Sequence, residues 1–155
     1  MMQDITTTFR EAKKLIERSE KILLISHRRP DGDTLGANLA VHFYLQSLGK
    51  KTTLACIDTA SERYDFLPDI HTFVKDFTYT DYDLIIVSDA GAHYMTHYHT
   101  IYPEIFSGKD VPVLNIDHHA SNDNFGTLNM VDPDAASTTV LLHRWFSFLR
   151  CTITP

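Results

Sequence analysis

Clusters of aspartate and histidine follow directly after three short apolar segments of this chain. The segments are KILLIS (21–26), DLIIVS (83–88) and VPVLNI (111–116). The residues that follow them are His27, Asp31, Asp33, Asp89, Asp117, His118 and His119. Burial of such ionisable groups costs free energy unless a partner compensates for it. These residue types raise the question of whether that partner is a metal ion.

Each cluster also has an ordinary structural interpretation when it is taken alone. Asp33 could be the N-cap of the helix that follows it, and Asp31 could form a turn between a proline and a glycine. A single Asp89 after a strand is more often a turn or cap residue, and a His118–His119 pair is more often surface than metal ligand. The coincidence of all three clusters at strand ends nevertheless favours a joint metal site.

The ligand types restrict the metal and its chemistry. Carboxylates and imidazoles without thiolates suit Mn²⁺, Fe²⁺, Co²⁺ or Mg²⁺ better than a structural zinc. With this many carboxylates, two ions that share one aspartate are expected rather than one ion. Two ions about 3.5–4 Å apart can activate water and neutralise oxygens on both sides of a phosphorus atom. The pattern therefore indicates hydrolysis of a phosphoester or a phosphoanhydride.

Strands and helices alternate along the sequence, which predicts the framework that brings these clusters together. The expected strands are 21–26, 52–57, 83–89, 111–117 and 128–131, with a further brief strand in HTFV (71–74). We expect an α/β fold: a doubly wound, mainly parallel sheet of about five strands with helices on both faces. Ligands of such sheets bind at the carboxyl ends of the strands, which is where all three clusters lie.

The expected helices are recognised by apolar residues at helical spacing. The first covers residues 3–18, the second ends near Gly49 as its C-cap, and the third begins after Asp134 or Ser137 as its N-cap. A further helical segment is expected between strands 83–89 and 111–117, and a short helix or turn in ERYDFLPDI. The apolar residues are Ile5, Phe9, Ala12 and Ile16, then Leu35, Leu39, Phe43 and Leu48, and finally Val140, Leu141, Trp145 and Phe148.

The composition is that of a soluble globular domain. The chain has 155 residues, of which 43% are hydrophobic and 22% charged, and a formal net charge of -6. This charge argues against broad binding to duplex nucleic acid but permits a small phosphorylated ligand. Cys56 and Cys151 are isolated, and no signal peptide or membrane-spanning run is evident, so a cytoplasmic protein without membrane contacts is expected.

Two other motifs are interpreted as unrelated to function. SLGKKTT resembles part of a phosphate-binding P-loop, but it follows a helix and precedes a strand, which is the reverse of the required order. His93 and His97 have metal-binding spacing on a helix, with His99 nearby. Tyr94 stands where a zinc protease needs glutamate, so a solvated helix with incidental affinity for nickel or zinc is the better interpretation.

Assembled, these motifs resemble the DHH phosphoesterase superfamily, which includes RecJ-type exonucleases. The resemblance runs from about residue 8 to the end and rests on His-x-x-x-Asp-x-Asp, Asp89 and Asp-His-His. SHRRPDGDTLGANLA and ERYDFLPDI are most similar to the nanoRNase and pAp phosphatase branch, and AASTT (135–139) resembles the segment that opens its last helix. The branch acts on short oligonucleotides and on 3′-phosphoadenosine 5′-phosphate (pAp).

The resemblance implies a role for each residue. One Mn²⁺ would be held by His27, Asp31 and Asp89, and a second by Asp33, Asp89 and His118, with Mg²⁺ or Co²⁺ as possible substitutes. Asp117 would orient a histidine from behind the metal ligands. His119 would face the scissile phosphate as a donor that stabilises charge. The catalytic residues implied in this way are Asp89, Asp117 and His119.

The resemblance also implies features that this sequence lacks. Family members add a metal-binding aspartate beyond residue 155 and a second, glycine-rich substrate-binding domain, so residues 1–155 resemble an amino-terminal DHH domain that is weak or inactive alone. Ala37 replaces a common serine, and Val140 lies near a common glutamate. The expected partner is a small nucleotide or a short single-stranded oligonucleotide, and a homodimer is also expected. Alternatives are a cyclic dinucleotide phosphodiesterase, a pyrophosphatase or exopolyphosphatase, or a non-catalytic nucleotide- or metal-binding module.

Overall fold

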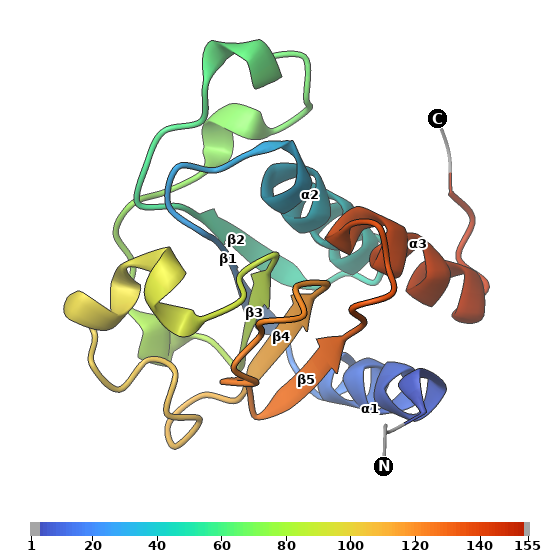
Figure 1. Ribbon diagram of the computed structural model, residues 1–155. Helices are drawn as coiled ribbons and strands as arrows, with labels where there is room; N and C mark the ends of the chain where they lie inside the picture. Colours follow the sequence, from blue (N-terminus) through green and yellow to red (C-terminus); the bar gives the residue numbers. More distant parts are fainter. Residues whose placement is uncertain (1–3, 154–155) are drawn as a thin grey trace.

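The branched apolar segments form five strands of one parallel sheet (Figure 1). The computed structural model describes residues 4–153. The strands are β1 (Lys21–Ser26), β2 (Lys51–Ala55), β3 (Leu84–Ser88), β4 (Val113–Asp117) and β5 (Leu128–Val131). All residues of β3 and β4 are buried, as both faces of a covered parallel sheet require. The predicted α/β fold with a parallel sheet is therefore confirmed.

The order of the strands in the sheet is β2-β1-β3-β4-β5. The chain moves from β1 outward to β2 and then returns past β1 to β3, so the order reverses between β1 and β3. Ser26 pairs with Ser88, and Ser88 pairs with Ile116, so the carboxyl ends of three strands are level. Open α/β sheets bind ligands at this kind of reversal. The topology therefore brings the three sequence clusters to one edge.

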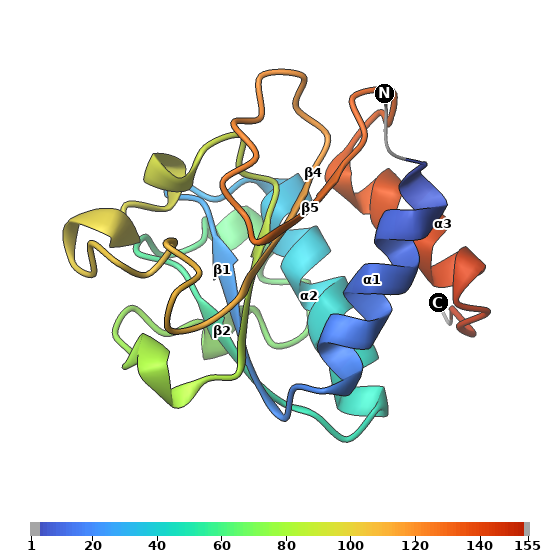
Figure 2. The same cartoon turned by 90° about the horizontal axis from the view of Figure 1, so that it is seen from below.

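One face of the sheet is covered by three α-helices (Figures 1 and 2). These are α1 (Ile5–Glu17), α2 (Gly32–Ser47) and α3 (Thr138–Phe148). Their apolar residues form one core cluster with Ile22, Leu24 and Ile86 of the sheet, and Trp145 of α3 is fully buried in it. Ser137 is the N-cap of α3, as predicted, since its hydroxyl accepts a hydrogen bond from the Val140 N–H.

The other face is covered by short 3₁₀ helices and loops (Figure 2). They include η3 (Tyr79–Asp81), η4 (His93–Thr96) and η5 (Tyr98–Thr100), whereas η1 (Glu62–Tyr64) and η2 (Ile70–Thr72) pack against the core cluster of the α-helices through Tyr64 and Ile70. The helical segment expected between β3 and β4 thus consists of two 3₁₀ helices. Tyr98 fills this second core cluster, and its hydroxyl donates to the Lys75 carbonyl. None of the helices within residues 4–153 has the length and apolarity needed to cross a membrane.

Some predicted details are wrong, mainly where helical periodicity was used to assign burial. Phe43 and Leu48 were expected on the buried face of α2 but are 38% and 47% exposed. The expected end of α2 near Gly49 is confirmed, because α2 ends at Ser47 and Gly49 follows Leu48 at φ 76°, the left-handed conformation of a C-terminal glycine. The expected strand HTFV (71–74) is limited to a single bridge between Val74 and Ala55. The expected apolar faces also included Val140 and Phe148, which are 38% and 36% exposed. The first predicted helix included residue 3, which lies outside the described residues.

Candidate metal centre

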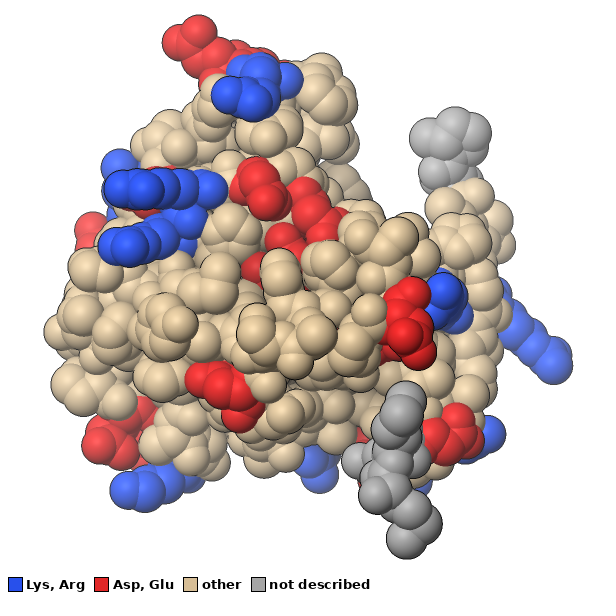
Figure 3. Space-filling view, viewed as in Figure 1, with Lys and Arg blue, Asp and Glu red and all other residues tan. Residues whose placement is uncertain are grey.

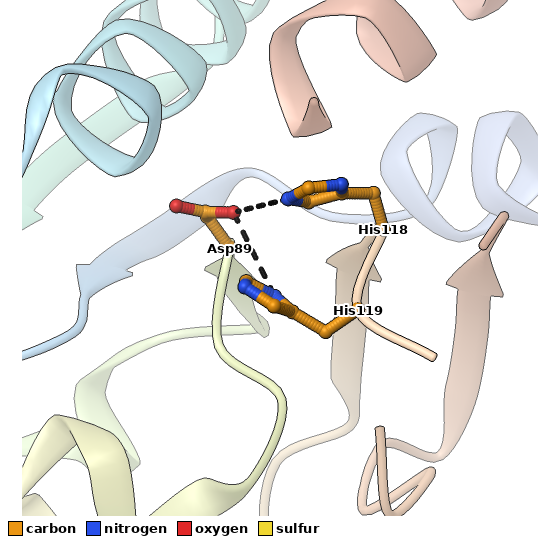
Figure 4. A group of neighbouring side chains, drawn as sticks. All are labelled: Asp89, His118 and His119. Carbon is orange, nitrogen blue, oxygen red and sulfur yellow. Dashed lines mark ion pairs between the residues drawn. The ribbon is translucent and has the colours of Figure 1, made fainter. Parts of the chain in front are cut away.

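Asp89 lies at the middle of the cluster and faces a histidine on each side. It follows β3 at φ 64°, and only 2% of it is exposed. Its Oδ2 lies 3.7 Å from Nε2 of His27, and its Oδ1 lies 3.7 Å from Nε2 of His118. The Thr138 hydroxyl donates a hydrogen bond of 2.8 Å to the same Oδ1. Figure 4 shows Asp89 pointing toward His118 and His119. One buried carboxylate therefore has an imidazole at each oxygen.

Backbone carbonyls orient both of these histidines. Nδ1 of His27 lies 2.7 Å from the Arg28 carbonyl, and Nδ1 of His118 lies 3.2 Å from the Ala135 carbonyl. A carbonyl only accepts, so Nδ1 carries the proton and, in the neutral ring, Nε2 carries the free electron pair. Both free pairs face Asp89. This is the tautomer and orientation that metal-binding histidines commonly have.

Asp31 and Asp33 occupy different positions from those that their ordinary interpretations gave them. Asp31, not Asp33, is the N-cap of α2, and its Oδ1 accepts from the N–H groups of Asp33 and Thr34 at 3.0 and 3.1 Å. The same Oδ1 lies 3.8 Å from Nε2 of His27. Because Asp31 is largely exposed and His27 comes only four residues earlier, this side of the cluster is built by one short segment.

Asp33 lies in the first turn of α2 and contacts the start of α3. Its Oδ2 accepts from the Thr138 N–H at 2.8 Å and its Oδ1 from the Thr139 N–H at 3.0 Å, while Oδ2 also lies 3.9 Å from Nε2 of His118. Burial alone would raise its pKa, but these backbone N–H groups outweigh burial and lower the pKa of Asp33. Asp33 therefore joins the two helices and remains an anion.

Asp117 lies behind the cluster and orients His119. It is fully buried at the end of β4, and its Oδ1 lies 2.7 Å from Nδ1 of His119. Its Oδ2 accepts from the Asn122 amide at 2.6 Å. Burial lowers the pKa of His119, but the hydrogen bond to Asp117 and the charge of Asp89 outweigh it, so that pKa is raised. His119 therefore keeps Nδ1–H on Asp117 and has Nε2 available for a ligand.

Two groups of three side chains have ligand atoms within 4.8 Å of one another. One group is His27, Asp31 and Asp89, and the other is Asp89, His118 and His119. Asp33 was predicted as a ligand beside His118, which it does approach, but it is not within that second group. Asp117 is in neither group. Acidic side chains also gather in a hollow of the surface near the start of α2 (Figure 3).

The cluster carries negative charge that the described residues do not neutralise with a lysine or arginine. Within residues 4–153, the ion-pair partners of Asp31, Asp33 and Asp89 are all histidines. Burial raises the pKa of Asp89, and the nearby Asp33 and Asp31 raise it further against the effect of His27 and Thr138. Burial lowers the pKa of His27, but Asp89 and the other neighbours outweigh it and raise that pKa. Both shifts are what a site that favours added positive charge produces.

Sequence reasoning did not find Thr138, Thr139 and Asn122. Thr138 and Thr139 lie in AASTT, which was noted only as the start of a helix. A helix N-terminus offers free N–H groups to an acid, but which acid reaches it depends on tertiary packing. Asn122 is a loop residue, and a loop asparagine usually bonds its own backbone. No sequence signal separates such residues from ordinary caps and turns.

His93 lies in η4, His99 lies in η5, and His97 lies between these two 3₁₀ helices, so none of the three is in an α-helix. The ring centroids of His93 and His99 are 5.6 Å apart, and those of His97 and His99 are 6.1 Å apart. His93 pairs with Asp123 at 3.6 Å between Nδ1 and Oδ2. These histidines form neither of the two ligand groups. Their incidental affinity for nickel or zinc stays a prediction.

The geometry agrees with the comparison to known families. The family model described as "DHH family, N-terminal domain" matches residues 21–151 of the sequence, and this range includes every residue of the cluster. The chain belongs to the DHH family. This result confirms the family resemblance that the sequence motifs indicated, and the matched residues include all five strands of the sheet.

Two curated relatives are both named bifunctional oligoribonuclease and PAP phosphatase NrnA. The protein from Mycoplasma genitalium is 26% identical over 147 residues, which cover 94% of this DHH chain and 45% of the relative. The protein from Thermus thermophilus is 32% identical over 123 residues, which cover 78% of this chain and 35% of the relative. The chain thus spans less than half of the length of either relative.

Two solved structures share the fold. An exopolyphosphatase-related protein from Bacteroides fragilis has a TM-score of 0.83 and 22% identity, with 92% of this chain and 43% of that chain covered. RecJ from Thermus thermophilus, solved with Mn²⁺, has a TM-score of 0.51 and 13% identity, with 96% of this chain and 21% of that chain covered. At these identities the likeness concerns the fold alone, and it agrees with the DHH assignment.

Proposed function

We propose that this DHH domain holds two divalent metal ions, preferably Mn²⁺, and hydrolyses phosphodiester or phosphomonoester bonds of short oligonucleotides or pAp. The observation that carries the proposal is the position of Asp89 between Nε2 of His27 and Nε2 of His118, 3.7 Å from each. The names of the curated relatives support the nucleotide substrates. Cytoplasmic localisation and a homodimer stay predictions.

The donor set fits such ions. Its ligand atoms are carboxylate oxygens and imidazole nitrogens, and its acids have only histidines as ion-pair partners within residues 4–153. His27, Asp31 and Asp89 would hold one ion, and Asp33, Asp89 and His118 the other. Asp33 retains acceptor capacity because each carboxylate oxygen has two lone pairs and accepts one N–H here. Imidazole and carboxylate together suit Mn²⁺ better than Ca²⁺.

Bound ions of this kind supply charge neutralisation and a nucleophilic water for displacement at phosphorus. The protein residues supply position and protons. Nδ1 of His119 is fixed on the buried Asp117, so Nε2 is the atom available to a phosphoryl oxygen or to the leaving group. Its raised pKa favours the protonated ring, which stabilises the negative charge that develops there. Asn122 holds the second oxygen of Asp117 and so keeps this pair aligned.

The test is release of phosphate or mononucleotide from pAp and from 5′-labelled dinucleotides, after metal removal with EDTA and addition of Mn²⁺, Mg²⁺ or Ca²⁺. Cyclic dinucleotide, pyrophosphate and polyphosphate are assayed in parallel. We expect turnover of pAp or the dinucleotide that depends on Mn²⁺. His119→Gln should lower kcat by about 10²- to 10⁴-fold, the usual effect of losing a positioned acid, with little change in Mn²⁺ binding.

His143→Gln is the matched control, because this exposed histidine is in neither ligand group. It should leave both turnover and metal binding unchanged. Turnover of pyrophosphate or polyphosphate alone would contradict the proposed substrate. Mn²⁺ binding without turnover of any of these phosphates would mean that the domain is a binding module.

A further inference from the structure

The loop between β1 and α2 presents two arginines beside the metal centre. Arg28 directly follows His27, and Arg29 precedes Asp31 by two residues. Consecutive Cα atoms are about 3.8 Å apart, so both arginines begin within a few ångströms of proposed metal ligands. Both residues are exposed. In Figure 3, basic side chains lie beside the acidic hollow where Figure 1 shows this loop.

The two guanidinium groups have no ion-pair or hydrogen-bond partner within residues 4–153. Neither arginine forms an ion pair there, and neither side chain donates a hydrogen bond there, whereas Arg144 pairs with Asp132 at 2.8 Å. Arginine is suited to phosphate because its planar fork donates two parallel hydrogen bonds. Two adjacent arginines without a protein partner are therefore available to an anionic ligand.

The backbone holds this pair in a defined position. The Arg28 N–H donates to the Met95 carbonyl at 2.9 Å, and the Arg29 N–H donates to Oδ2 of Asp58 at 2.8 Å. Arg29 also has φ 52°, a left-handed conformation that is unfavourable for a residue with a side chain. The loop is thus tied to two separate segments of the protein. A ligand that binds there meets preorganised groups and loses less conformational entropy.

We propose that Arg28 and Arg29 bind the phosphate of the substrate that is not cleaved. This inference rests on the proposed function, in which the scissile phosphate lies at the metal ions, and it adds a second phosphate-binding position on the β1–α2 loop. The pair would favour substrates with two phosphate groups, such as pAp, over the same nucleoside with only the scissile phosphate. The arginines act in ground-state binding and not in the chemical step.

The test compares pAp with adenosine 3′-monophosphate, which has the same scissile bond but lacks the second phosphate. The variants are Arg28→Gln/Arg29→Gln, the conservative Arg28→Lys/Arg29→Lys, and the control Arg18→Gln. Arg18 is an exposed arginine at the other end of β1, where it caps α1. Mn²⁺-induced thermal stabilisation, measured for every variant, shows whether fold and metal binding are retained.

We expect the wild type to have a KM for pAp at least about tenfold below that for the monophosphate, because hydrogen bonds to charged groups are involved. The double glutamine variant should lose this preference through KM, with kcat changed less than about twofold, since uniform binding is affected. The lysine variant should retain part of it, and Arg18→Gln all of it. Equal losses for both substrates, or an unchanged preference, would overturn the second phosphate position.

Failure of the proposed function would be distinguishable from failure of this inference. If the Mn²⁺-loaded wild type cleaves neither pAp nor the monophosphate, calorimetry can measure the dissociation constants of both compounds, because no turnover interferes with the titration. These constants then replace KM in the comparison. A preference for pAp that the double glutamine variant abolishes would support the arginine position even without hydrolysis. Equal affinities of the wild type for both compounds would overturn it.

Discussion

The two oxygens of Asp89 differ in how far apart in the sequence their neighbouring residues lie. On the Oδ2 side, His27 and Asp31 come from one loop and are only four residues apart. On the Oδ1 side, His118, Thr138 and Asp33 come from three separate elements. Asp33 accepts a hydrogen bond from the N–H of Thr138, which lies 105 residues later in the sequence. One side is thus a product of local sequence, whereas the other requires α2, α3 and β4 to be packed first.

This difference predicts unequal responses to mutation on the two sides. A ligand on the local side can change without disturbing distant packing, because the hydrogen bonds and the ion pair that the Asp31 side chain forms within residues 4–153 all lie between residues 27 and 34. A ligand on the other side also joins two helices, so metal binding and folding are coupled there. Asp89 belongs to both sides and should therefore give the largest effect.

We expect Asp89→Ala to weaken Mn²⁺ binding on both sides by more than about 100-fold. Loss even of a residue that only supports a ligand costs 10- to 100-fold, and Asp89 faces both histidines directly. Calorimetric titration with Mn²⁺ measures the stoichiometry and affinity. Asp81→Asn, at an exposed residue before β3, is the control. An Asp89→Ala protein that binds one ion with wild-type affinity would show that Asp89 serves only one side.

We expect Asp33→Asn to lower the free energy of unfolding by about 1–3 kcal/mol in EDTA, since a charged acceptor of two backbone N–H groups is lost. Asp31→Asn should change it by less than about 0.5 kcal/mol, because asparagine is an equally good N-cap. Urea denaturation measures both. Both variants should weaken Mn²⁺ binding. Equal free energies of unfolding for Asp33→Asn and Asp31→Asn in EDTA would contradict the proposed coupling of folding and metal binding on the α3 side.

The effect of Asp33→Asn should also depend on pH. The pKa of Asp33 is lowered in the folded state, so its stabilising contribution is present above about pH 3.8, the unfolded value, and is lost as pH falls through the lower folded pKa. The stability difference between wild type and Asp33→Asn should therefore shrink in acid below pH 3.8. A difference that stays constant down to pH 2 would mean that it arises from packing and not from charge.

The same division explains what the sequence could predict. The strands were recognisable as short apolar runs, and parallel pairing necessarily brings the residues after β1, β3 and β4 to one edge. His27 and Asp31 could be placed at this edge because both follow β1 directly, and the family resemblance implied that they share a metal ion. The contact of Asp33 with Thr138 and Thr139 could not, because it depends on how α3 approaches α2, for which no local pattern exists.

Burial of helix faces was the weaker part of the sequence interpretation. Apolar spacing correctly indicated Leu35 and Leu39 but also included Phe43 and Leu48, which are exposed. Helical periodicity identifies a stripe of residues, whereas the width of the contact is decided by the neighbouring elements. The second face of the sheet was harder still, because irregular loops and 3₁₀ helices lack a long period that could be recognised.

The stability contribution of His27 should decrease with rising pH in the metal-free protein, whereas stabilisation by Mn²⁺ should increase with rising pH. The raised pKa of His27 stabilises the metal-free fold fully below about pH 6.5, and this contribution is lost as pH rises through the folded pKa. Mn²⁺ needs the unprotonated ring, so its affinity should increase with pH by about tenfold per unit for each proton displaced. The difference in melting temperature with and without Mn²⁺ should thus widen from pH 6 to 8. In His27→Gln this widening should diminish, and a wild-type difference independent of pH would exclude His27 as a ligand.

The smallest effect is expected from Thr138, whose hydroxyl contacts only the Oδ1 side of Asp89 at 2.8 Å. Thr138→Val keeps the shape of this buried residue but removes the donor, which should cost about 1 kcal/mol of stability without metal. Affinity for the ion on the His118 side should fall about threefold to tenfold, as expected for a residue that supports a ligand, whereas the ion on the His27 side should be affected less than about twofold. Thr138→Ser, which retains the hydroxyl, should behave like the wild type. Two-site calorimetric titration separates the ions, and an equal loss at both would show that Thr138 acts on Asp89 as a whole, so that the two sides are not independent.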